Sequence, residues 1–258
     1  MVIKKADFEY INKETKEFLN KEFIFNEGNF GGVSLAEENT RVKLIYSPNW
    51  NEWIKAMYYV GFTTWNNGFE INLDEIKEEE REKLLVDFIK KRPVSAVLES
   101  ASFIFKLDNV PRSMTHQIVR ARFAAFNQES YRVTPAHHAD VRVTKEMGEE
   151  NIKKIKEKMN DLRQLYVDMI KSGVPTEHAR NILPMGTCTH ICSMMNLKVL
   201  IDYVKARTLD IAQDEHTYIV CLMMQELKVN QPKFFDILKS YIPIIEETMK
   251  KYLGDKYF

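Results

Sequence analysis

Residues 187–206 read TCTHICSMMNLKVLIDYVKA, and this stretch decides the class of fold. Its first part, residues 187–194, is interpreted as a β-strand. Its second part, residues 196–206, spaces Leu197, Leu200, Ile201 and Val204 as a helix with one buried face requires. A strand that runs directly into a helix indicates a fold that contains both.

The rest of the chain extends this pattern and adds mostly helices. The spacing of apolar residues predicts strands over 42–46 and 97–107. It predicts helices over 51–60, 74–91 with a cap at Asn72, 113–125 after Pro111, 145–172, 212–227 and 233 to the end, with a short helix restarting at Pro175. No G-x-G-x-x-G motif follows a strand, which argues against a doubly wound dinucleotide fold. The sequence therefore predicts a helix-rich α/β (α+β) fold.

Length and charge limit the classes of function. The chain has 258 residues, with 37 Lys and Arg against 37 Asp and Glu, and no net charge. This balance argues against a broad surface for duplex nucleic acid or anionic membrane, but it allows a local phosphate site. We expect one domain over 41–258, preceded by a polar extension over 1–40. No stretch is apolar enough for a leader or a membrane span.

The three cysteines point to a reducing compartment, so we expect a cytoplasmic protein. Cys188, His190 and Cys192 lie close together in the sequence, but no second Cys/His pair follows at the spacing of a zinc site. We therefore predict no metal site.

Polar side chains crowd one segment, residues 116–132, which reads HQIVRARFAAFNQESYR. Its planar cations and amides are Gln117, Arg120, Arg122, Gln128 and Arg132, with the hydroxyl of Ser130 beside them. Guanidinium groups suit bidentate contacts to phosphate, and amides suit the edge of a base or a flavin ring. A surface helix with ordinary salt bridges is the alternative interpretation.

A second polar group follows downstream. Arg180 precedes ILP, and Asn196, Lys198, Asp202 and Arg207 interrupt an otherwise apolar helix. Lys198 and Asp202 stand four residues apart on one helix face, where a plain ion pair is the simpler interpretation. Arg207 precedes the helix break TLDIAQDE, so its guanidinium can project into a cleft.

Together these segments resemble the flavin-dependent thymidylate synthases. The signature of that family is R-H-R-x7-S, and this chain has Arg120-Ala121-Arg122 followed by seven residues and Ser130. Three further blocks are similar in order and spacing: VSAVLESASFIFKL at 94–107, ARNILP at 179–184 and VKARTLDIAQDE at 204–215. The resemblance covers roughly residues 42–228.

The resemblance implies a homotetramer of α/β subunits with shared active sites, each binding FAD and a uridine nucleotide. The implied reaction is reductive methylation of dUMP to dTMP at C5, with methylenetetrahydrofolate as carbon donor and NADPH as reductant of the flavin. By position, the implied flavin residues are Arg120, Arg122, Gln128, Asn196, Lys198 and Asp202. The implied nucleotide residues are Gln117, Gln128, Ser130, Arg132, Arg180 and Arg207. Arg207 is the expected catalytic residue, because a fixed cation at the uracil edge makes C5 a better nucleophile.

The chain departs from the family pattern on the flavin side. Ala121 replaces the histidine of the signature, Pro93 or Val94 stands where another histidine is usual, and Lys198 and Asp202 stand where Arg and Asn are frequent. Two alternatives follow: a divergent enzyme for a different uridine nucleotide or one-carbon transfer, and a non-catalytic nucleotide-binding protein. We favour an active enzyme, because a mere binder has little use for Arg207 beside the base.

A third hypothesis is a binder of single-stranded nucleic acid. Phe123, Phe126 and Tyr131 stand among the arginines and would serve as stacking platforms. The balanced charge and the downstream segments around Arg180 and Arg207 argue against it.

Overall fold

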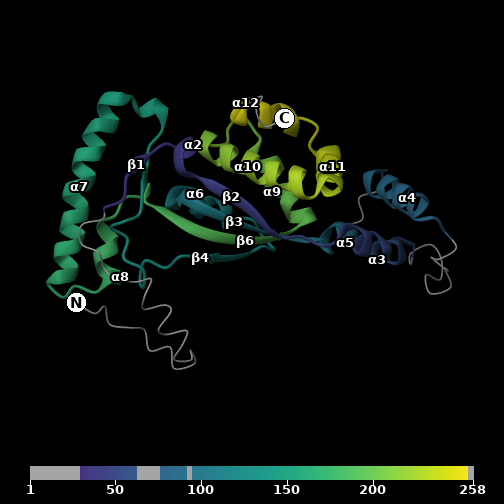
Figure 1. Ribbon diagram of the computed structural model, residues 1–258, viewed down its shortest axis with the longest axis horizontal. Coiled ribbons are helices and arrows are strands. Elements are labelled where there is room, and N and C mark those ends of the chain that lie inside the picture. Colours follow the sequence, from purple (N-terminus) through teal and green to yellow (C-terminus); the bar gives the residue numbers. More distant parts are fainter. Residues whose placement is uncertain (1–29, 63–75, 92–94, 255–258) are drawn as a thin grey trace, which may run out of the picture. The chain divides into compact units, whose positions relative to one another are not determined.

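The computed structural model describes residues 30–62, 76–91 and 95–254 (Figure 1). The chain folds into two compact units, each assembled from separate segments. Of the described residues, unit 1 comprises 30–40, 109–115 and 128–191, and unit 2 comprises 41–62, 76–91, 95–108, 116–127 and 192–254. No helix among the described residues is both long enough and apolar enough to cross a bilayer.

Most of a four-stranded sheet belongs to unit 2. Its strands are β2 (Arg41–Tyr46), β3 (Ser102–Pro111), β6 (Cys188–Asn196) and β4 (Ala125–Gln128), in that spatial order. β2 and β3 pair antiparallel, with Arg41 opposite Asp108 and a register shift between Leu44 and Tyr46. The Glu226 carboxylate accepts a 3.0 Å hydrogen bond from the N–H of Leu44, which satisfies a donor on this edge strand.

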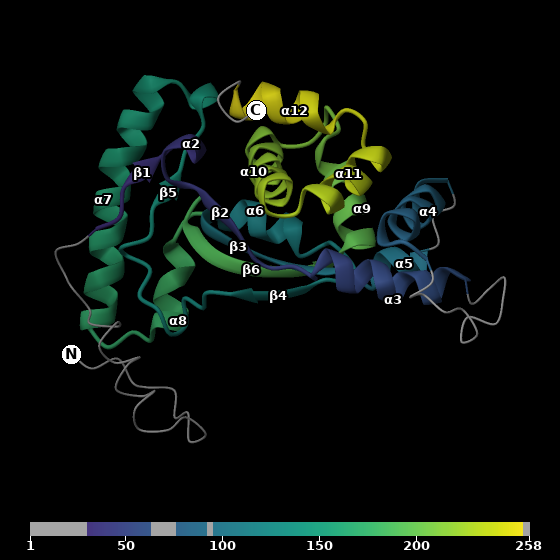
Figure 2. The same ribbon diagram turned by 45° about the vertical axis from the view of Figure 1, so that its right-hand side comes forward.

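Helices cover one side of this sheet and one of its ends. They are α3 (Trp50–Phe62), α4 (Glu78–Lys91), α5 (Ser95–Glu99), α9 (Leu197–Arg207), α10 (Asp214–Asn230), α11 (Pro232–Tyr241) and α12 (Ile245–Leu253). Figure 2 shows α9 to α12 on one side of the sheet. The core is aromatic: the Phe234 ring lies 4.9 Å from Trp50 and Trp53 and 5.1 Å from Phe103. These contacts fix α3 and α11 against β3.

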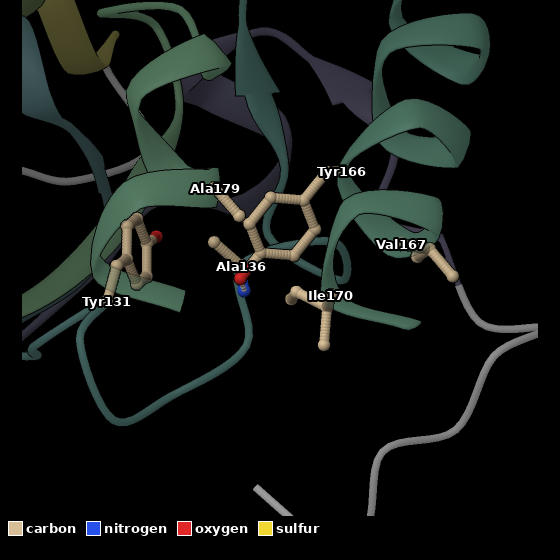
Figure 3. Close-up of a cluster of buried hydrophobic side chains, with 6 residues drawn as sticks. All are labelled: Tyr131, Ala136, Tyr166, Val167, Ile170 and Ala179. Atoms are coloured by element: carbon tan, nitrogen blue, oxygen red, sulfur yellow. Dashed lines mark hydrogen bonds between the residues drawn. The ribbon is translucent and has the colours of Figure 1, made fainter. Parts of the chain in front are cut away.

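Unit 1 is built on one long helix and two short parallel strands. Its elements are β1 (Val33–Ser34), α2 (Ala36–Asn39), β5 (Val141–Arg142), the 3-10 turn η3 (Lys145–Met147), α7 (Glu149–Lys171), α8 (Thr176–Ala179) and the 3-10 turn η4 (Arg180–Ile182). Figure 3 shows the Tyr166 ring reaching from α7 toward Ala136 and Ala179 in the buried core. The Tyr166 hydroxyl accepts a 3.2 Å hydrogen bond from the N–H of Ala136, so the ring also orders the loop before β5.

Polar contacts tie residues 30–40 into unit 1. The Asp140 carboxylate accepts hydrogen bonds from the N–H of Gly32 and from the side chains of Ser34, Asn39 and Asn109, at 2.7–3.2 Å. Burial acts to raise the pKa of Asp140, but these four donors outweigh it and hold the pKa below its usual value. Part of the predicted extension is therefore integrated into this unit. Residues 1–29 lie outside the described residues, and the domain boundary at 41 stays a prediction.

The helix-rich α/β class is confirmed, but the helix predicted over 113–125 is too long. The helix there is α6 (Arg112–Ile118), and the chain then turns and forms β4. In the turn that replaces the rest of the predicted helix, Val119 and Phe123 are 48% and 91% exposed. Phe123 has a φ of 60°, which no right-handed helix accommodates.

The predicted strand over 97–107 begins too early. Residues 95–99 form α5, and the strand runs over 102–111. Val97 and Leu98 are adjacent and both buried, which a helix turn allows and the alternation of a strand does not. The helix predicted from 233 onward is divided into α11 and α12, and the predicted cap Asn72 lies outside the described residues.

Candidate functional site

Two predicted nucleotide residues of unit 2 are in direct contact. Gln117 lies near the end of α6 and Arg207 ends α9, 90 positions later. Arg207 donates from Nη1 to the side-chain oxygen of Gln117 at 3.1 Å and from Nη2 to its backbone carbonyl at 3.4 Å. The Nε of Arg207 is buried and has no hydrogen-bond partner within the described part of the chain. The guanidinium is thus held in place by Gln117, and its buried Nε–H is left without a partner there.

Two buried residues support this pair from the interior of unit 2. His216 lies in the first turn of α10, and its Nδ1 is 3.3 Å from the side-chain oxygen of Gln117. Its Nε2 is 2.6 Å from the hydroxyl of Tyr203 in α9. Burial and the nearby Arg207 cation lower the pKa of His216 to about 3, so the ring is neutral at physiological pH. Burial also raises the pKa of Tyr203, which keeps its hydroxyl protonated.

Arg120 and Arg122 lie in the turn between α6 and β4 rather than on a helix. The turn is closed by hydrogen bonds from the N–H of Arg120 to Gln117 and from the N–H of Ala121 to Ile118, at 3.2 and 3.0 Å. Both arginines are exposed, and no described residue forms an ion pair or side-chain hydrogen bond with either. They are two exposed cations of unit 2 on which an anionic ligand can act.

The remaining predicted flavin residues of unit 2 cap α9 or lie in its first half. The Asn196 side chain caps the helix by accepting a 2.9 Å hydrogen bond from the N–H of Val199. Lys198 and Asp202 form an ion pair along the helix surface. The ion pair that is the simpler interpretation of these two residues is therefore present. A ligand that binds Lys198 has to compete with Asp202.

Four predicted residues lie in unit 1, and two of them meet at one glutamate. Arg132 contacts the Glu177 carboxylate through Nε at 3.0 Å and Nη2 at 2.9 Å. Arg180 donates from Nε to the backbone carbonyl of Glu177 at 3.3 Å. Ser130 is exposed in the turn just before Arg132, whereas Gln128 donates to the Thr115 hydroxyl at 3.1 Å. The predicted nucleotide residues of unit 1 therefore include two cations, Arg132 and Arg180, that both contact Glu177.

Sequence reasoning missed the residues that hold these side chains in place. His216, Tyr203 and Glu177 are not among the residues that the sequence predicts for the site. A weak signal existed, because Tyr203 stands four residues before Arg207 on the same helix. The contact of His216 with Gln117 joins positions 99 apart and leaves no local trace.

Comparison with known proteins decides the family. Residues 44–233 match the family model described as thymidylate synthase complementing protein. The chain belongs to this family. The match includes every residue predicted for the site, from Gln117 to Arg207.

Relatives of the family are similar at about one third identity. The chain is 32% identical to the flavin-dependent thymidylate synthase of Sulfurisphaera tokodaii over 142 residues, which cover 54% of this chain and 55% of that one. It is 30% identical to that of Sulfolobus acidocaldarius over 170 residues, 65% of each chain, and 31% identical to that of Pyrococcus furiosus over 169 residues, 63% and 69%. The chain thus spans between about half and two thirds of the length of these relatives.

A solved structure has the same fold. The UMP/dUMP methylase PolB from Streptomyces cacaoi, bound with 5-Br dUMP, superposes with a TM-score of 0.66 at 15% identity. The match covers 81% of this chain and 97% of that one. At this identity the likeness concerns the fold, and it supports the helix-rich α/β class found here.

Proposed function

We propose that the protein transfers a one-carbon unit to C5 of a uridine monophosphate and reduces it to a methyl group, converting dUMP to dTMP. The observation that carries this proposal is the contact between Arg207 and Gln117, in which a guanidinium is fixed while its Nε keeps no partner within the described residues. Family membership and relatives named flavin-dependent thymidylate synthases support it.

Arg207 is the proposed catalytic residue. Its charge is permanent, and Gln117 holds it in two hydrogen bonds, so little reorganisation accompanies the reaction. Placed at the uracil edge, this cation stabilises the negative charge that develops as C5 becomes a nucleophile. Gln117 contacts the same nucleotide.

Arg132, Arg180 and Ser130 of unit 1 are the proposed phosphate ligands. Guanidinium groups bind phosphate through paired N–H donors, and the Ser130 hydroxyl adds a short polar group. We propose a homotetramer with active sites shared between subunits. The donors of unit 1 and those of unit 2 therefore need not come from one copy of the chain.

The donor set of unit 2 fits the diphosphate of FAD. Arg120 and Arg122 are exposed cations, and no described residue pairs with their side chains. When bound, the flavin supplies the hydride that completes the methyl group, with methylenetetrahydrofolate as proposed carbon donor and NADPH as reductant. Asn196, Lys198 and Asp202 are proposed to contact the same cofactor, and Gln128 to contact both cofactor and nucleotide.

A second candidate function is nucleotide binding without reduction. Ala121 offers a methyl group where the family signature has a hydrogen-bonding histidine. Asp202 neutralises Lys198 within α9. Both features weaken the flavin side and leave the nucleotide side intact.

Visible absorbance of the purified protein separates the two candidates. A flavin spectrum that bleaches with NADPH, together with turnover of dUMP or UMP in the presence of methylenetetrahydrofolate, supports the enzyme. A colourless protein that binds dUMP in calorimetry supports the second candidate. A protein that does neither contradicts both, and tight, steeply salt-dependent binding of an oligonucleotide would favour the single-stranded nucleic-acid binder.

The variant Arg207→Ala tests the proposed catalytic role. It should lower kcat/KM for the uridine nucleotide by at least about a hundredfold, the scale of losing a preorganised donor to a developing charge. The matched control is Arg41→Ala in β2, an exposed arginine of the same unit. The control should stay within about twofold of wild type. Wild-type turnover in Arg207→Ala would contradict the assignment.

A further inference from the structure

A continuous chain of hydrogen bonds leads from the interior of unit 2 to the proposed nucleotide residue Gln117. It runs from Tyr203 to His216, from His216 to Gln117, and from Gln117 outward to Gln213. Tyr203 is 5% exposed and His216 is fully buried, whereas Gln213 is exposed. This chain of hydrogen bonds therefore connects the core of unit 2 to its surface through the Gln117 amide.

The direction of every hydrogen bond in this chain follows from Arg207. A guanidinium only donates, so the Gln117 atom 3.1 Å from Nη1 is the amide oxygen. Because His216 Nδ1 faces the same oxygen, Nδ1 carries the proton of the neutral ring. Nε2 is then an acceptor, and it accepts the proton of the Tyr203 hydroxyl. An inverted amide would place its NH2 group against the guanidinium of Arg207, which only donates.

The orientation fixes what Gln117 presents to the surface. With its oxygen held by Arg207 and His216, the amide nitrogen points the other way and donates to Gln213 Oε1 at 2.8 Å. Gln213 immediately precedes α10 and its side chain is exposed, so a ligand atom can take its place. That atom has to be a hydrogen-bond acceptor.

We propose that His216 and Tyr203 are positioning residues that lock the Gln117 amide with its NH2 group toward the nucleotide, so that the site selects an acceptor oxygen of the ligand. This inference rests on the proposed function of Gln117 as a nucleotide residue. Carbonyl oxygens of uracil and phosphate oxygens are both acceptors, whereas the exocyclic amino group of cytosine is a donor. A locked amide therefore favours uridine over cytidine nucleotides where it meets position 4 of the base, since O2 is an acceptor in both bases.

The test compares two replacements of His216. Asn keeps an N–H donor close to the position of Nδ1–H, while Leu fills similar space with no donor. Binding of dUMP, dCMP and deoxyuridine is measured by calorimetry, and kcat and KM are measured for dUMP. His216→Leu should weaken dUMP about tenfold, and His216→Asn should restore it to within about threefold. KM should change more than kcat, since Arg207 keeps its bond to the backbone carbonyl of Gln117.

The Tyr203→Phe variant tests the interior end of the chain. It should weaken binding of dUMP by about threefold, because the His216 ring loses the hydroxyl that holds its Nε2 in place. The matched control is Tyr166→Phe, which removes a buried hydroxyl from the core of unit 1. The control should leave the Kd for dUMP within about twofold, although it too lowers the melting temperature.

Comparing dUMP, dCMP and deoxyuridine identifies which ligand oxygen accepts from the Gln117 amide. Loss of discrimination between dUMP and dCMP in His216→Leu supports contact with the base. Equal weakening of dUMP and dCMP with unchanged deoxyuridine supports contact with the phosphate. If His216→Leu binds dUMP like wild type, or if His216→Asn does not restore dUMP binding, this inference is overturned and the proposed function is not affected. A wild-type protein that binds no uridine nucleotide overturns the proposed function and this inference with it.

Discussion

Replacing Glu177 by Gln should strengthen the binding of a nucleotide monophosphate. The Glu177 carboxylate occupies Arg132, with Nε and Nη2 at 3.0 and 2.9 Å from the same oxygen. A phosphate that binds the same two donors of Arg132 has to displace the carboxylate first. The Gln variant removes the competing charge and keeps the size of the side chain. The backbone carbonyl of Glu177, which accepts from Arg180, is unaffected.

The magnitude follows from the exposure of the pair. The Arg132 and Glu177 side chains are 64% and 41% exposed, so water and salt screen their attraction. Exposed pairs of this kind contribute about 0.2–1 kcal/mol. Removing the competitor should therefore tighten the Kd for dUMP by about 1.4- to 5-fold, and more at low salt than at physiological salt. The free energy of unfolding should change by no more than the same amount.

Calorimetric titration with dUMP and with deoxyuridine measures the effect. Only dUMP carries the phosphate, so only its Kd should improve. Glu150→Gln is the matched control, because it removes an exposed ion pair with Lys154 from the same unit and changes the net charge equally. The reasoning is refuted if Glu177→Gln binds dUMP more weakly than wild type, or if deoxyuridine or the control shows the same gain.

Four further substitutions test the stability of the two units, each measured by urea unfolding. Gly31→Ala should lower the free energy of unfolding by about 1–3 kcal/mol, because the added Cβ would lie 2.3 Å from the Ala139 carbonyl oxygen. Gly148→Ala should lower it by about 1–2 kcal/mol, because Gly148 has a φ of 74° although the space around it is open. Asp140→Asn should lower the free energy of unfolding by about 1–3 kcal/mol at pH 7. The pKa of Asp140 is depressed in the folded state. The extra stability of the wild type should therefore be present above about pH 4 and vanish as the pH falls through the folded pKa. Phe234→Ala should cost about 3–5 kcal/mol, because three aromatic rings pack against this fully buried side chain.

The elements with strong local signals were predicted from the sequence. The apolar residues of 145–172 recur at helical spacing, and α7 runs over Glu149–Lys171. Asn196 was placed at the start of a helix, and it caps α9. In both cases the information lies within a few turns of chain, where spacing and capping act.

The segment between α6 and β4 could not be predicted in the same way. Its apolar residues suggested a continued helix, but Phe123 is 91% exposed and adopts a left-handed backbone conformation. Burial in this segment is decided by tertiary packing rather than by local spacing. The same limit applies to the site, since the contact between Gln117 and Arg207 joins residues 90 positions apart.

The sequence locates the cations, but the structure shows which of them are already engaged. Arg132 is paired with Glu177 and Lys198 with Asp202, whereas Arg120 and Arg122 have no side-chain partner among the described residues. A count of positive residues therefore overstates the charge that a ligand meets. Binding at an engaged cation is an exchange of one anion for another, and its free energy is the difference between two similar contacts. Differences of this size are set by the neighbouring carboxylates, so the acidic residues of the site are expected to tune ligand affinity as much as the arginines do.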